Sequence, residues 1–165
     1  RIDETAQMAL RLDAAIAEVP LPNGQRSDAF ARAERAAWEE TGEAYRPALL
    51  ADVPLIPAHT ALLTTTVYHG SNPPGIVDIV PSESPRPAGW TAALVIVDGL
   101  IGQAVDDGIC QRFSHVPGMP ELLLRAVSYR RHVNDLHSAS RSNTRSHIER
   151  VEQHLVSRAS AILER

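Results

Sequence analysis

The chain of 165 residues contains no lysine, and all sixteen of its basic side chains are arginine. This absence excludes chemistry that requires a lysine amine, such as a Schiff base, a pyridoxal-phosphate anchor or the phosphate-binding lysine of a P-loop. Arginine cannot replace lysine in these roles because its guanidinium stays protonated. A high-GC coding bias, which also fits the abundance of alanine, arginine, valine and proline, is the simplest explanation of the missing lysine.

Cysteine and aromatic residues are also scarce. The single cysteine, Cys110, cannot form an internal disulfide, so a reducing cytoplasm is the simplest compartment. Only seven residues are Phe, Trp or Tyr, and the core is therefore expected to be mainly aliphatic. The length and the hydrophobic fraction of 44% are typical of one globular domain. We therefore expect a single domain over residues 1–165.

Long hydrophobic runs are absent as well. The most apolar segment, 89–105, is interrupted by Thr91, Asp98 and Gln103 and is short for a bilayer span. The first residues lack the basic, apolar and small-residue order of a secretory signal. These observations predict a soluble cytoplasmic protein without a membrane partner.

The charges that are present are unevenly distributed. Residues 1–43 hold nine acids and five arginines, whereas residues 111–165 hold five acids and nine arginines. The last block also contains five of the seven histidines, so its positive charge grows as pH falls. An acidic front and a basic tail can pair with each other.

Apolar periodicity predicts a mainly α, single-domain bundle of about five helices. The segment 89–106 is apolar on nearly all sides and is expected at the centre, since length and period favour a helix over a buried strand at 93–97. Ser27 is a plausible N-cap for the second helix, and Ser146 with Glu149 has capping-box spacing for the last helix if that helix begins there. One long helix over 120–164 is an open alternative to two. The expected helices are 2–19, 28–40, 89–106, 120–136 and 146–162.

The proline-rich region 47–88 is harder to interpret. Its eight prolines are incompatible with long helices. Two β-like runs, 61–68 and 76–80, are separated by the turn-forming stretch 71–75, which would suit a small hairpin. We slightly favour the alternative of a short helix over 58–68 followed by an irregular loop over 70–88.

The strongest local cluster of functional side chains is the arginine and histidine set of the last third. Arginine forks match planar and tetrahedral anions, so these residues are candidates for binding an anion or nucleic acid. The competing interpretation, which we favour, is a solvated face that pairs with the acidic first helices. The candidate anion-binding residues are Arg130, Arg141, Arg145, Arg150, His154 and Arg158.

Within this cluster, the segment from Arg131 to His137 resembles the Arg-x(4–6)-His motif of HEPN ribonucleases, which are small helical bundles that act as dimers. The resemblance implies that His137 is the acid or base, that Arg131 binds the RNA phosphate, and that His132 is the polar residue after the arginine. It covers seven residues. The chain has four arginine–histidine pairs at the allowed separations, whereas about two are expected by chance.

No cofactor is expected. The histidines lack the spacing of a helical metal site, the glycines lack a nucleotide-binding order, and there is no G-x-S-x-G elbow. We therefore expect a non-catalytic interaction or regulatory module that self-associates or binds a protein partner through its C-terminal helices. The alternatives are a helical ribonuclease using Arg131 and His137, and a nucleic-acid or anion binder using the basic face.

Overall fold

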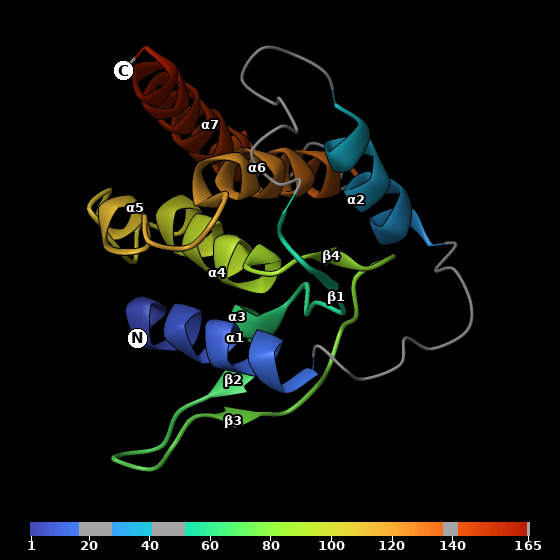
Figure 1. Ribbon diagram of the computed structural model, residues 1–165, viewed down its shortest axis with the longest axis vertical. Helices are drawn as coiled ribbons and strands as arrows, with labels where there is room; N and C mark the ends of the chain where they lie inside the picture. The colour runs from blue at the N-terminus through green and yellow to red at the C-terminus, as the bar shows by residue number, and fades with distance from the viewer. Residues whose placement is uncertain (17–27, 41–51, 137–141, 165) are drawn as a thin grey trace.

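The computed structural model describes residues 1–16, 28–40, 52–136 and 142–164, and its architecture is mainly helical (Figure 1). Five longer helices correspond to the five that the sequence predicts, so the expected mainly α fold is confirmed. Two single-turn helices, α3 (Leu62–Thr65) and α5 (Ile109–Arg112), and two small sheets complete the described part. The longer helices are α1 (Ile2–Ile16), α2 (Ala29–Glu39), α4 (Trp90–Ile101), α6 (Met119–Asp135) and α7 (Ser142–Leu163).

Helix α4 forms the centre of the core. Every residue from Trp90 to Val97 is buried, and α1, α6 and α7 all pack against this helix (Figure 1). The close approach of α1 depends on Gly99, since a Cβ there would lie 2.8 Å from the side chain of Ile2. The central position predicted for segment 89–106 is therefore confirmed, and the alternative of a strand at 93–97 is wrong.

Two separate helices, α6 and α7, occupy the C-terminal region. They pack against each other, so the alternative of one continuous helix over 120–164 is wrong. Pro120 lies in the first turn of α6, after Gly118 in a left-handed conformation at φ 69°. Helix α7 begins at Ser142, so Ser146 lies inside the helix and the predicted capping box is also wrong.

The proline-rich region combines both structures that the sequence allowed. A single helical turn, α3 (Leu62–Thr65), precedes β2 (Thr66–Val67), which pairs antiparallel with β3 (Gly75–Ile76). The short strands β1 (Leu55–Ile56) and β4 (Arg86–Pro87) make a second antiparallel pair that joins the two ends of the region. The hairpin is much shorter than the runs 61–68 and 76–80. Its paired residues are Thr66 with Ile76 and Val67 with Gly75.

Two smaller features complete the fold. The N-cap of α2 is Asp28, whose Oδ1 accepts a hydrogen bond of 2.8 Å from the N–H of Ala31. The predicted N-cap, Ser27, lies outside the described residues. None of the helices in the described ranges combines the length and the apolar character that crossing a membrane requires.

Candidate functional site

Arg130, one of the predicted anion-binding residues, forms an ion pair within the protein. Its Nε and Nη2 donate to the two carboxylate oxygens of Asp98 on α4, at 2.6 and 2.8 Å. A further bond of 2.9 Å joins Nη2 to the carbonyl oxygen of Thr60. This two-pronged pairing is the geometry that arginine forms and lysine cannot. The guanidinium therefore fastens α6 to α4 and to the proline-rich region.

Arg131, the arginine of the HEPN-like motif, also contacts carboxylates. Its Nη2 lies 2.6 Å from Oε1 of Glu40, and its Nε lies 3.4 Å from Oε1 of Glu152 on α7. Ser128 donates to the same Glu40 carboxylate, and Arg125 donates to the Glu40 carbonyl oxygen at 2.6 Å. These contacts attach the end of α2 to α6. His137 lies outside the described residues, so the ribonuclease hypothesis stays a prediction.

The basic face of α7 lies against the carboxyl end of α4. Nη2 of Arg150 donates to the carbonyl oxygen of Leu100 at 3.0 Å, and Nδ1 of His147 donates to that of Ile101 at 3.2 Å. The last carbonyls of a helix lack partners within the helix and carry a partial negative charge, so cationic side chains suit this position. The face therefore caps a helix of its own protein.

The remaining predicted anion-binding residues are dispersed. Nδ1 of His154 lies 3.8 Å from Oδ2 of Asp107, and Arg158 donates to the side chain of Gln111 at 3.2 Å. Arg145 is exposed and pairs with Glu149 on its own helix, at 3.2 Å. Arg141 lies outside the described residues. The structure thus distributes the described members of the predicted set among contacts within the protein and does not gather them into one site.

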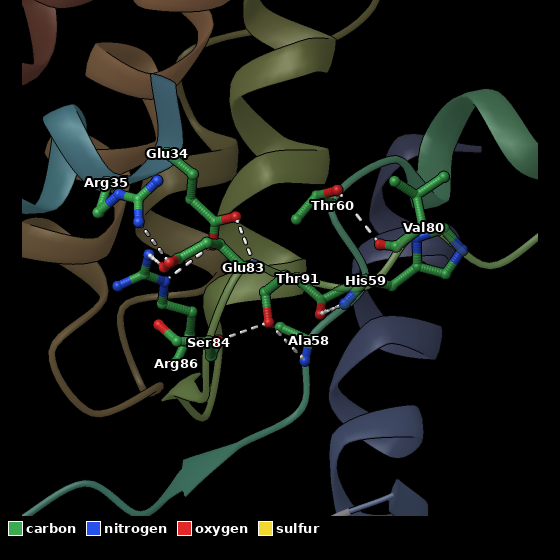
Figure 2. A network of polar contacts seen from close by, with 11 residues as sticks. Glu34, Arg35, Ala58, His59, Thr60, Val80, Glu83, Ser84, Arg86 and Thr91 are labelled. Carbon is green, nitrogen blue, oxygen red and sulfur yellow. Dashed lines mark hydrogen bonds and ion pairs between the residues drawn. The ribbon is translucent and has the colours of Figure 1, made fainter. Parts of the chain in front are cut away.

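A buried ionic network that the sequence did not reveal connects α2 to the segment before α4. Glu34 is 1% exposed, and its carboxylate accepts from Nε of Arg86 at 2.8 Å and from the N–H of Glu83 at 2.9 Å (Figure 2). Glu83 also pairs with Arg35 at 3.1 Å. Arg86 lies over the ring of Trp38, at 5.1 Å from its centroid. Each charge has a partner, which is typical of a structural anchor.

His59 is a buried histidine that joins three segments. Its backbone N–H donates to the Thr91 hydroxyl at 3.0 Å (Figure 2). Its Nε2 donates to the carbonyl oxygen of Asp78 at 2.9 Å, and its Nδ1 accepts from the N–H of Ala61. Burial lowers the pKa of the imidazole because the charged form is desolvated. A neutral, fully bonded imidazole of this kind holds loops together.

Asp13 is different, because its charge lacks a compensating cation among the contacts of the described residues. The side chain is on α1 and is 5% exposed. Oδ2 accepts from the N–H of Gly89 at 2.8 Å, whereas the buried Oδ1 has no hydrogen-bond partner. Burial raises the pKa of this carboxyl to about 6, although the N–H of Gly89 and the neighbouring hydroxyl of Thr91 oppose the rise.

Asp13 lines a cleft of about 410 Å³, which we call the Asp13 cleft. Its walls come from α1, the segment leading into β1, the residues before α4, and the connection between α5 (Ile109–Arg112) and α6. Volumes of this order are typical of sites for small molecules. The described lining residues are Leu10, Asp13, Ala14, Asp52, Val53, Pro54, Ile56, Ala88, Gly89, His115, Val116 and Pro117.

Most of this lining is apolar, and its ionisable groups are few. Among the described lining residues, Asp13, Asp52 and His115 are the ones with ionisable side chains, and arginine is absent. Asp52 and His115 are exposed, so water screens them far more than Asp13. An apolar hollow with one buried, perturbed carboxyl is a candidate binding site.

One signal in the sequence could have identified Asp13. The buried residues of α1 follow the helical spacing Ile2, Ala6, Ala9 and Asp13, so the carboxylate occupies a core position of an amphipathic helix. A charge at such a position is costly and calls for an explanation. No signal identified the other walls of the cleft, because they come from segments far apart in the chain.

The described residues include no group of three or more His, Cys, Asp or Glu side chains arranged to hold a metal ion. Comparison with known proteins found no matching family model, no matching curated protein and no matching solved structure.

Proposed function

We propose that the protein is a non-catalytic binding or regulatory module whose ligand is a small, largely apolar molecule held in the Asp13 cleft. The observation that carries this proposal is a hollow of about 410 Å³ beside a buried carboxylate oxygen without a hydrogen-bond partner. An unpaired buried oxygen costs about 1–3 kcal/mol. Local costs of this kind often occur at functional sites.

The basic C-terminal helices support a binding function less well. Arg130 and Arg131 form ion pairs of 2.6 Å with Asp98 and Glu40, and Arg150 bonds to a carbonyl of α4. An incoming phosphate would have to displace these partners. For this reason we place the ligand in the Asp13 cleft and not on the arginine and histidine face.

The test uses benzyl alcohol as a neutral probe and follows backbone amide resonances in ¹⁵N-labelled protein. A ligand with so few atoms is expected to bind with a dissociation constant on the order of 1 mM. The amide signals of Gly89 and Val116, which line the cleft, should shift with saturable dependence on the probe. Absence of such shifts, or shifts confined to another part of the protein, would refute the proposal.

Two matched variants on α1 locate the binding. Ala14 lines the cleft and is exposed, so Ala14→Trp should fill the mouth of the cleft without disturbing the core. Ala15 is the exposed neighbour outside the lining, so Ala15→Trp adds the same side chain elsewhere. We expect Ala14→Trp to abolish the shifts and Ala15→Trp to retain them. Equal behaviour of the two variants would place the binding outside the cleft.

A second candidate function, self-association, is favoured by a different observation. The arm formed by residues 66–79, which includes β2 and β3, lies beside α1, and its turn projects beyond the helices (Figure 1). It carries the exposed side chains of Val67, Ile76, Val77 and Ile79, the last two being 66% and 72% exposed. Asp78 is its only carboxylate and it has no arginine, so two copies can approach with little repulsion. We propose that this arm binds a second copy of the chain.

Sedimentation velocity over a range of concentrations tests self-association. Val77→Glu adds a charge to the exposed arm, and Arg145→Glu, on the exposed side of α7, is the control for a changed surface charge. We expect the wild type and Arg145→Glu to associate with rising concentration and Val77→Glu to remain monomeric. A wild-type monomer at every concentration would end this second candidate.

A further inference from the structure

We propose that the ligand of the Asp13 cleft carries a protonated amine, which donates to the Asp13 carboxylate while the apolar part of the ligand fills the rest of the cleft. This inference rests on the proposed function and deepens it by naming the chemical class of the ligand. It depends on three features: the unpaired oxygen of Asp13, the charges of the lining, and the apolar walls.

The first feature is the missing donor at Asp13. A carboxylate accepts up to about four hydrogen bonds. Here Oδ2 receives the N–H of Gly89 at 2.8 Å, and Oδ1 has no hydrogen-bond partner although it is buried. Rotation of the carboxyl about its Cβ–Cγ bond would bring this oxygen to the cleft, where a ligand N–H would satisfy it and recover the cost of its burial. The site therefore selects for a hydrogen-bond donor and against a ligand with only acceptors.

The second feature is the sign of the charge around the cleft. Asp13 and Asp52 are carboxylates, and His115 is the one basic side chain among the described lining residues. His115 is exposed and stacks on Phe113. The positive end of α4 is already engaged, because Oδ2 of Asp13 takes the Gly89 N–H there. An anionic ligand would meet two like charges, whereas a cation would meet two opposite ones.

The third feature is the apolar wall. Leu10, Val53, Ile56 and Val116 line the cleft together with alanine and proline side chains. Apolar surface of this kind gains free energy by covering an aromatic or aliphatic body, and charge then fixes the orientation of the ligand. In a partly dehydrated cleft the attraction between an ammonium group and Asp13 is stronger than in water. The preferred ligand is thus an amine attached to an apolar group of modest size.

Three probes with the same aromatic ring distinguish the possibilities: benzylamine, benzyl alcohol and benzoate. We measure their dissociation constants at pH 7.5 by the amide shifts described above. The expected result is that benzylamine binds at least about tenfold more tightly than benzyl alcohol, and that benzoate binds most weakly. Equal affinity of the amine and the alcohol would overturn the amine inference and leave the proposed function standing. Failure of all three probes to bind would refute both.

Two variants assign the preference to Asp13. Asp13→Asn keeps an oxygen for the Gly89 N–H and removes the charge, so the ratio of benzylamine to benzyl alcohol affinity should fall to about one. Asp52→Asn removes the other, exposed carboxylate of the lining. Because water screens an exposed charge, the ratio in Asp52→Asn should fall by less than about threefold. If Asp52→Asn abolishes the preference and Asp13→Asn retains it, the inference is wrong.

Discussion

The Asp13 carboxylate on α1 accepts a hydrogen bond of 2.8 Å from the N–H of Gly89, the residue immediately before α4. Side-chain oxygens commonly satisfy the free N–H groups at the start of a helix, but here the oxygen comes from a helix distant in sequence. The contact joins α1 to the central helix and positions a carboxylate at the wall of the cleft. Structure and binding therefore depend on the same residue.

Asp13 should make the protein less stable at neutral pH than at mildly acidic pH. Its folded-state pKa, about 6, lies above the ordinary value of 3.8, so the folded state holds the proton more tightly than the unfolded state does. The free energy of unfolding contributed by this group is highest below pH 3.8 and decreases as pH rises through 6. Ionisation is therefore destabilising in this window.

The replacement Asp13→Asn removes this ionisation. We expect it to raise the free energy of unfolding at pH 7.5 by about 1–2 kcal/mol, the gain from lost charge burial less the cost of a new amide N–H group. The difference from the wild type should fall by about 2 kcal/mol between pH 7.5 and pH 4, so that near pH 4 the variant is slightly less stable than the wild type. Urea unfolding at the two pH values measures this difference in stability. Asp52→Asn, which changes an exposed aspartate, is the control. A variant that is equally destabilised at both pH values would show that the carboxylate is purely a structural cap.

The ion pair of Arg130 with Asp98 should contribute far more to stability than that of Arg145 with Glu149. The first is two-pronged and largely shielded from water, with 17% and 19% of the two side chains exposed. The second is exposed and lies within one helix. Arg130→Ala leaves Asp98 without its partner, so we expect a loss of about 3 kcal/mol, whereas Arg145→Ala should cost less than about 0.5 kcal/mol. Chemical denaturation of both variants compares them, and similar losses would contradict the anchoring role of Arg130.

Gly89 should tolerate a side chain much less well than Gly70. Both have positive φ angles, +99° and +56°. At Gly89 an added Cβ would lie 3.0 Å from Leu122 and 3.1 Å from Val116, whereas at Gly70 it would meet nothing within 4 Å. Gly70→Ala pays only the backbone cost of about 1 kcal/mol, and Gly89→Ala adds crowding of about 1–3 kcal/mol. Melting temperatures of the two variants test this prediction. Equal decreases in melting temperature for Gly89→Ala and Gly70→Ala would contradict it.

Local patterns in the sequence were sufficient to predict the long helices. Segment 89–106 is apolar on nearly all sides, and a helix of that kind is expected to be buried, as α4 is. The proline-rich region could not be predicted in the same way, because its helical turn and its short strands depend on contacts with distant residues. The bonds of His59 to Thr91 and Asp78 are examples. Short apolar runs alone cannot distinguish helix from strand.

The candidate site was predicted less well than the fold, for a physical reason. Helical spacing shows which face of a helix carries Arg130 or Arg150. It does not show whether that face contacts solvent, a carboxylate or a backbone carbonyl. Their partners, Asp98 and Leu100, belong to a helix at least 32 residues away in the chain. Asp13 was readable as a charge on an apolar stripe, whereas the cleft beside it required the folded arrangement of four segments.

The most direct test of the account is an NMR titration of the Asp13 carboxyl carbon with and without saturating benzylamine. Following this carbon alone separates its ionisation from that of Asp52 and His115, the other titrating groups described in the lining. Without ligand the pKa should be about 6. If benzylamine binds the protein with ionised Asp13 tenfold more tightly than the protein with protonated Asp13, saturation must lower the pKa of Asp13 by about one unit. A pKa of Asp13 that is unchanged at saturating benzylamine would contradict the account.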